Sequence, residues 1–180
     1  VRTRVTHNGG SELYSKAIST YLAMAVSKMA DYSNSLAVWY PQEDRPKNLF
    51  AAQAIPMVWD FPEQNPFTKI GGSFHACVRI VSEAFEALGR GPVAEVMQAS
   101  AVDAAGMSGV MATDPPYYDN VGYSDLSDFF YVWLRRSLRK VFPNLLSTIA
   151  FPKAEELVAT PYRHGTKQKA EKFFLDGMTQ

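Results

Sequence analysis

The chain of 180 residues is 47% hydrophobic, 13% aromatic and 20% charged, and its 18 basic residues balance 18 acidic ones. This composition excludes intrinsic disorder, which requires low hydrophobicity and a high net charge. A single cysteine excludes a disulfide-stapled scaffold, and no apolar run approaches the roughly 18 residues of a membrane span. The first residues lead into polar sequence and show no signal peptide, so we expect a soluble protein of the cytoplasm.

Apolar residues recur at helical spacing over 11–32, 73–89 and 124–142, which predicts an amphipathic helix over each range. Gly89 and Gly91 supply the end of the second helix. Acidic and hydroxyl side chains crowd the start of the third, where they complement unpaired backbone N–H groups. We expect shorter helices near 154–159 and 166–177, after the break at Phe151 and Pro152.

The stretch 31–72 has no sustained periodicity, although it holds five of the 11 prolines and two of the 3 tryptophans. An irregular segment of this length is unusual in a compact domain and is commonly functional. Its aromatic side chains either stack on bases or, as we favour, anchor the segment to the core. They are Trp39, Tyr40, Trp59, Phe61 and Phe67.

Two short apolar segments, 93–99 and 109–113, have the character of buried parallel strands. A helix, two strands and another helix in this order predict an α/β fold built on part of a parallel sheet. We therefore expect residues 1–92 to form a helical, aromatic-rich insertion region and residues 93–180 to form part of the α/β domain. The two may also form one continuous domain fragment.

The most informative residues follow the second predicted strand: Asp114, Pro115, Pro116 and Tyr117. Ligands bind at this end of the strands in open α/β sheets. Asp114 offers a carboxylate acceptor, and the prolines give a stiff turn whose carbonyls remain acceptors. Tyr117 adds a flat face for stacking, so the group suits the exocyclic amino group of a planar base. An ordinary turn at the end of a strand is the alternative.

These four residues resemble the DPPY motif of amino-directed DNA methyltransferases, which methylate adenine at N6 or cytosine at N4. In that family the Asp carboxylate and the first Pro carbonyl accept hydrogen bonds from the target amino group. The aromatic residue stacks on a base flipped out of the duplex. The resemblance implies these roles for Asp114, Pro115 and Tyr117, with Pro116 completing the motif. It implies catalysis by positioning and electrostatic stabilisation, without a covalent enzyme intermediate.

The longer run 114–134 is similar to a large family of adenine-specific DNA methylases, whose members often carry a zinc ribbon and a domain of unknown function. Segments 54–61, 65–67 and 161–165 are similar to it as well, so the resemblance covers most of the chain. It implies a partial Rossmann-like fold with an insertion, S-adenosylmethionine as cofactor, and double-stranded DNA with an adenine target as partner. Tyr118, Asp119, Asn120 and Tyr123 are then candidates to line the target pocket; a plain surface loop and a helix lead-in are the alternatives.

The sequence departs from this family at the cofactor site. The family's Gly-rich loop, similar to Asp-Pro-Phe-x-Gly-x-Gly, has no counterpart, since Gly71-Gly72 follows no predicted strand. Ser100 stands where many methyltransferases place an Asp, which leaves Ser100 and Asp114 as candidates for cofactor contacts. With Val1 in place of an initiator Met, these departures lead us to expect a fragment of a longer enzyme. The sequence leaves open whether such a fragment is active alone and whether it self-associates through exposed sheet edges.

Two basic stretches are candidates for phosphate contacts. The first lies toward the end of the third predicted helix, where we favour a solvated face. The second, near the C-terminus, leaves nucleic-acid contact and plain surface equally open. The first stretch is Arg135, Arg136, Arg139 and Lys140, and the second is Arg163, His164, Lys167, Lys169 and Lys172.

The motif leaves other functions open. DPPY does not separate DNA adenine methylation from RNA or cytosine-N4 methylation. The missing Gly-rich loop and the zero net charge favour a non-catalytic nucleic-acid-binding or assembly module for the isolated chain. The scattered histidines and the single cysteine have no zinc-like spacing, so we expect no metal site.

Overall fold

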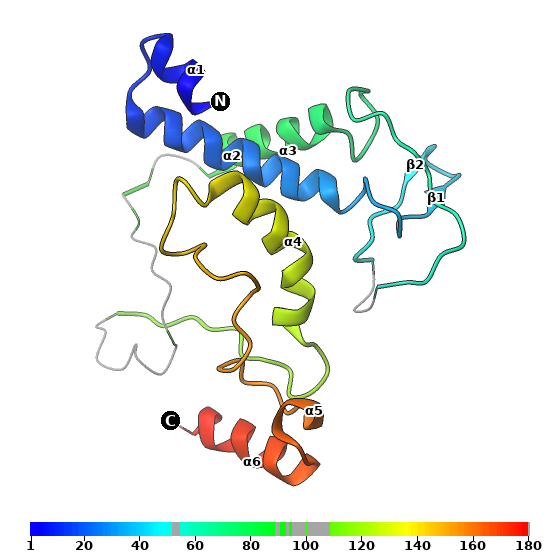
Figure 1. Cartoon of the computed structure of the whole chain (residues 1–180), viewed down its shortest axis with the longest axis vertical. Helices are drawn as coiled ribbons and strands as arrows, with labels where there is room; N and C mark the ends of the chain where they lie inside the picture. Colours follow the sequence, from blue (N-terminus) through cyan, green and yellow to red (C-terminus); the bar gives the residue numbers. More distant parts are fainter. Residues whose placement is uncertain (52–54, 89–90, 93, 95–99, 101–108, 180) are drawn as a thin grey trace. The chain divides into compact units, whose positions relative to one another are not determined.

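A computed structural model describes residues 1–51, 55–88, 91, 92, 94, 100 and 109–179 (Figure 1). The chain divides into two compact units. The first comprises Val1–Pro92 and Phe130–Ser147, and the second comprises Val93–Phe129 and Thr148–Gln180. We expected residues 1–92 to be an insertion region and residues 93–180 to be part of the α/β domain. The two compact units do not identify either region, so this assignment stays a prediction.

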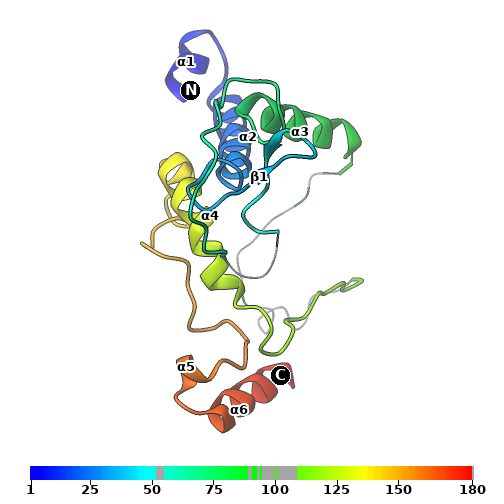
Figure 2. The same cartoon turned by 90° about the vertical axis from the view of Figure 1, so that its right-hand side faces the viewer.

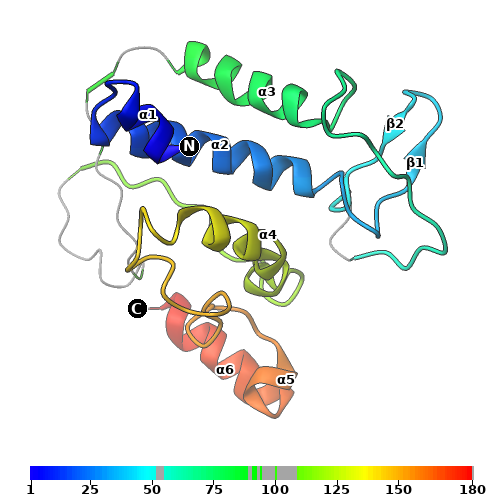
Figure 3. The ribbon, with the colours of Figure 1, turned by 45° about the horizontal axis from the view of Figure 1, so that its top comes forward.

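The first unit is helical. Its helices are α1 (Arg2–His7), α2 (Glu12–Ala30), α3 (Phe74–Ala87) and the later part of α4 (Tyr123–Leu138). α3 runs back alongside α2 (Figure 3), and the rings of Tyr21 and Phe85 meet edge to face at 4.1 Å between centroids. The serines before α2 and α3 cap both helices, because each hydroxyl accepts a hydrogen bond from a backbone N–H of the first turn.

Small and aliphatic side chains fill the core of this unit. Ala23 of α2 is buried with Tyr131, Leu138 and Leu146, so the alanine lets the larger side chains approach the helix closely. Cys77 of α3 is also buried.

The irregular segment after α2 contains a small hairpin and is fastened to the helix end. β1 (Trp39–Tyr40) pairs antiparallel with β2 (Arg45–Pro46). The buried Asp31 accepts hydrogen bonds from two backbone N–H groups, that of Leu49 at its carbonyl and that of Phe50 at its carboxylate. One residue, through its backbone carbonyl and its side chain, therefore fixes the chain where it returns from the hairpin.

The second unit holds the first turns of α4 and the helices α5 (Pro161–His164) and α6 (Lys167–Met178). Figure 2 shows α5 leading directly into α6. Thr166 caps α6, and the His164 ring stacks on Phe173 at 4.3 Å between centroids. The segment before α5 is extended, with Val158 buried.

The predicted helices over 11–32, 73–89, 124–142 and 166–177 are confirmed, with ends shifted by a few residues. α4 stops at Leu138, and Pro143 prevents its continuation, because a proline lacks the N–H and its ring clashes with the carbonyl four residues earlier, that of Arg139. The helix expected over 154–159 is wrong, since this range forms a turn and then irregular backbone. The carbonyl of Glu156 accepts from the N–H of Val158, two residues on, and not from residue 160 as it would in a helix.

Residues 109–113 do not form the predicted strand: they are exposed, and they pair with no described strand. Their backbone groups therefore lack the partners that a sheet would supply. The strand predicted over 93–99 falls outside the described residues, apart from residue 94. The described part of the chain is mostly helical, with one two-stranded sheet, so the Rossmann-like α/β fold stays a prediction. None of the described helices is both long and apolar enough to cross a membrane.

Candidate functional site

The four motif residues lie on an exposed, extended segment of the second unit. Asp114 and Pro115 are exposed, Pro116 is half-buried, and Tyr117 is 53% exposed. The Tyr117 hydroxyl donates a long hydrogen bond of 3.4 Å to the Asp114 carboxylate. The negative charge of Asp114 raises the pKa of the Tyr117 phenol above its usual value. The structure thus brings the carboxylate and the aromatic ring of the motif together at the surface.

A tight turn follows the motif at once. The N–H of Asn120 donates to the carbonyl of Tyr117 at 3.1 Å, which closes a four-residue turn. Tyr118, the second residue of this turn, has a φ of +56°. Glycine usually takes such a position, because a Cβ clashes with the neighbouring backbone when φ is positive. A tyrosine there needs support from outside the turn.

Residues near the C-terminus give Tyr118 that support. The N–H of Ala159 donates to the Tyr118 carbonyl at 3.0 Å. The Tyr118 hydroxyl donates to Glu171 of α6 at 3.0 Å, and its ring meets Phe174 edge to face at 5.2 Å. Partial burial and the hydrogen bond to Glu171 raise the pKa of the Tyr118 phenol. The turn is therefore attached to α6 and to the segment that precedes α5.

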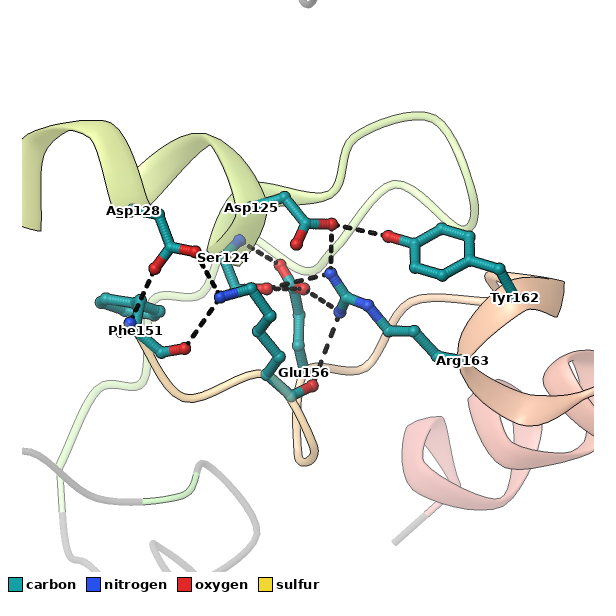
Figure 4. A network of polar contacts seen from close by, with 8 residues as sticks. Ser124, Asp125, Asp128, Phe151, Glu156, Tyr162 and Arg163 are labelled. Carbon is teal, nitrogen blue, oxygen red and sulfur yellow. Dashed lines mark hydrogen bonds and ion pairs between the residues drawn. The ribbon is translucent and has the colours of Figure 1, made fainter. Parts of the chain in front are cut away.

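A polar network ties the start of α4 to the same C-terminal segment (Figure 4). Arg163 donates to Glu156 at 2.5 Å, to Asp125 at 2.6 Å and to the Ser124 hydroxyl at 3.1 Å. Ser124 in turn donates to Glu156 through its N–H, at 2.8 Å, and through its hydroxyl. Tyr162 donates to Asp125 at 2.6 Å. The Arg163 and Glu156 side chains are only 13% and 14% exposed, so this pair is largely buried, whereas Asp125 and Tyr162 lie at the exposed side of the network.

A second group of polar contacts lies one turn further along α4. Asp128 accepts hydrogen bonds from the Lys153 ammonium at 2.5 Å and from the Phe151 N–H at 2.7 Å. Two successive turns of the helix are thus joined to the segment 151–156.

The three carboxylates of this network are held in their charged form. Hydrogen bonds from Tyr162 and Arg163 lower the pKa of Asp125, and the Lys153 ammonium lowers that of Asp128. Burial alone would raise the pKa of Glu156, but the hydrogen bonds that it accepts outweigh burial and lower it. The Arg163 guanidinium faces carboxylates here, so its charge stabilises the loop that runs from Tyr118 to the start of α4.

The other predicted site residues are spread along the same unit. Asp119 and Asn120 are exposed on the turn, and Tyr123 begins α4 with 45% of its surface exposed. Ser100 is exposed, and its neighbours 95–99 and 101–108 lie outside the described residues. Both Ser100 and Asp114 are exposed, and the contacts expected between these two residues and S-adenosylmethionine stay a prediction.

Sequence reasoning missed the acidic and aromatic partners of the loop: Glu156, Glu171 and Phe174. They lie far from the motif in sequence, and nothing in their local pattern distinguishes them from ordinary helix or loop residues. Arg163 was singled out as a basic residue, with phosphate contact and plain surface as alternatives, and it contacts carboxylates instead.

Two further interpretations of surface residues can be compared with the structure. Arg136, Arg139 and Lys140 are exposed and Arg135 is half-buried, an arrangement that suits either a solvated face or phosphate contact, so the solvated face stays a prediction. The anchoring role expected for the aromatic side chains of 31–72 is wrong for Trp59 and Phe67, which are exposed.

Comparison of the chain with models of known protein families gives no match, and neither the curated proteins nor the solved structures contain a match. Within the described residues, no three His, Cys, Asp or Glu side chains gather as metal ligands would.

Proposed function

We propose that the chain supplies the target-base site of an enzyme that transfers a methyl group from S-adenosylmethionine to N6 of adenine in DNA. The observation that carries this proposal is the contact between the Asp114 carboxylate and the Tyr117 side chain on an exposed segment. Pro115 and Pro116 join the two residues and limit the conformations of the segment. Exposure supports the proposal because a flipped base must enter such a site from solvent.

The chemistry of these residues fits an exocyclic amino group. Of its two N–H bonds, one donates to the Asp114 carboxylate and the other to the Pro115 carbonyl. These acceptors keep the nitrogen lone pair from delocalising into the ring, which leaves the nitrogen nucleophilic. Stacking on Tyr117 adds about 1–3 kcal/mol of binding free energy. The 3.4 Å contact between the Tyr117 hydroxyl and Asp114 is long, so an amino group can replace it at little cost.

The test is transfer of a labelled methyl group from S-adenosylmethionine to duplex DNA by the enzyme to which the chain supplies this site, with the isolated chain run beside it, followed by digestion and mass spectrometry of the nucleosides. We expect label in N6-methyladenine. We expect Asp114→Ala to lower the rate of methyl transfer at least about 100-fold. Asp176→Asn is the matched control, because this exposed aspartate of α6 forms its ion pair with Lys172, one helical turn away on the same helix. Label in 4-methylcytosine, or in RNA alone, would assign a different target. An Asp114→Ala variant with the same activity as the unsubstituted chain would contradict the mechanism.

A non-catalytic nucleic-acid-binding module is the second candidate. The lack of a Gly-rich cofactor loop in the sequence and the zero net charge of the chain favour it. Separate titrations of the chain with S-adenosylmethionine and with DNA distinguish the two candidates. Saturable binding of DNA without any binding of S-adenosylmethionine would favour the module, whereas binding of both would favour the enzyme.

A further inference from the structure

Tyr118 occupies a backbone conformation that its own side chain disfavours. Its φ of +56° lies in the left-handed region, at a turn position where glycine is the usual residue. Such conformations persist only where the surrounding structure holds them, and they cluster at functional sites. Without its partners, we expect residue 118 to leave this region and the turn between Tyr117 and Asn120 to open.

The partners of Tyr118 act on three parts of the residue. Ala159 holds the carbonyl, Glu171 holds the hydroxyl and Phe174 packs against the ring. These residues follow Tyr118 by about 40 to 56 positions in the sequence, so the turn depends on tertiary contacts.

The other end of the same loop is held by the same C-terminal segment. Ser124 and Asp125 are joined to Glu156 and Arg163, a few residues on either side of Ala159. Between the two anchors, Val121 is buried and the neighbouring residues 119 and 120 are exposed. The loop is therefore fixed at both ends. Tyr117, the last residue of the motif, immediately precedes it in the chain.

We propose that Tyr118 is a positioning residue that sets the direction in which Tyr117 and Asp114 face the target base. Its hydroxyl and ring are directed to Glu171 and Phe174, so Tyr118 acts through the backbone of the turn and does not itself stack on the base. The identity of the base rests on the proposed function. The anchoring of the turn rests only on the contacts described above.

The first experiment measures amide hydrogen exchange, with the N–H groups of Asn120 and Ala159 as reporters. Both are hydrogen-bonded donors of this turn, to the carbonyls of Tyr117 and Tyr118. We expect Tyr118→Ala and Glu171→Ala to accelerate exchange at both amides at least 10-fold. Glu171→Gln retains an acceptor and should restore most of the protection. Asp176→Asn, on the same helix, should leave both amides unchanged.

Amides inside α6 report whether each variant is folded, and Tyr118→Phe, which loses only the hydroxyl, replaces Tyr118→Ala if that variant unfolds. Exchange at Asn120 and Ala159 that stays at the unsubstituted rate in Glu171→Ala and in the folded Tyr118 variant would overturn the anchoring.

The second experiment measures methyl transfer in the same variants. A positioning role predicts that Tyr118→Phe and Glu171→Ala lower kcat at least 10-fold while KM for S-adenosylmethionine is unchanged. A stacking role for Tyr118 would instead raise KM for DNA in Tyr118→Ala but not in Tyr118→Phe, which keeps the ring, and Glu171→Ala would have no effect, an outcome that overturns the proposal. Absence of transfer by the unsubstituted enzyme to which the chain supplies this site would count against the proposed function, and the exchange measurements on the chain would still decide whether Tyr118 holds the turn.

Discussion

Arg163 and Asp125 form an ion pair of 2.6 Å that joins residues 38 positions apart in the sequence. Asp125 lies in the first turn of α4, and Arg163 lies in the last turn of α5. Arg163 also pairs with Glu156, so one guanidinium connects both carboxylates. The fork of N–H donors in an arginine suits this arrangement, which a lysine ammonium would reproduce poorly.

Arg163→Ala should lower the free energy of unfolding by about 2 kcal/mol, because it leaves the Glu156 carboxylate largely buried without a cation. Arg163 and Glu156 both keep some contact with solvent, so the loss in free energy of unfolding stays below that for a fully buried ion pair. Urea denaturation monitored by circular dichroism measures the change. Lys172→Ala removes an exposed pair at i, i+4 and should cost under about 0.5 kcal/mol. Equal losses in the two variants would show that the network does not stabilise the fold.

Stability should fall in acid as the carboxylates of this network take up protons. The pKa values of Asp125, Asp128 and Glu156 are lowered in the folded chain from ordinary values of 3.8, 3.8 and 4.5. The unfolded chain therefore binds more protons at acidic pH, so the stabilisation is complete above these ordinary values and is lost as pH falls through the folded values. Urea midpoints from pH 7 to pH 3 measure this slope.

The matched pair for this pH dependence is Glu156→Gln and Glu155→Gln. Glu155 is exposed beside the network, so its substitution should leave the slope unchanged. Glu156→Gln removes one titrating group and should flatten it. A Glu156→Gln chain with the slope of the unsubstituted protein would place the acid sensitivity elsewhere.

Gly72→Ala should destabilise the first unit by about 2 kcal/mol or more. Gly72 has a φ of +81°, and a Cβ built there would lie 2.6 Å from Cγ of the Tyr32 ring. Both backbone strain and overlap therefore oppose the substitution. Gly91→Ala is the control, since a Cβ at Gly91 meets nothing within 4 Å and should change stability by less than about 1 kcal/mol. A Gly72→Ala chain as stable as Gly91→Ala would contradict this packing.

Cys77 should react slowly with a disulfide reagent in the folded chain. Its side chain is 1% exposed, and burial raises the pKa of the thiol, so both access and the reactive thiolate are limited. At pH 8 we expect modification at least about 100-fold slower than in urea. Gln168→Cys in a Cys77→Ala background supplies an exposed thiol on α6 that should react freely in the folded protein. Equal reactivity of the two thiols would mean that Cys77 is accessible.

Local sequence patterns predicted α2, α3, α4 and α6 because helical periodicity and caps are properties of neighbouring residues. Ser11 and Ser73 illustrate this, since each caps a helix within three residues of itself. The helix expected over 154–159 failed for a non-local reason. Glu156 bonds to Ser124 and Arg163, and Ala159 donates its N–H to Tyr118, so these groups serve tertiary contacts in place of a helix.

The sequence by itself identified Asp114, Pro115, Pro116 and Tyr117 as the candidate chemical group, because a carboxylate, two prolines and an aromatic ring are adjacent in the chain. Only the tertiary structure decided that Tyr118 faces Glu171 and that its φ is positive. The physical reason is distance along the chain: periodicity, capping and turn propensity act over a few residues. Closing a loop of 53 residues between Tyr118 and Glu171 depends on packing that no local pattern encodes.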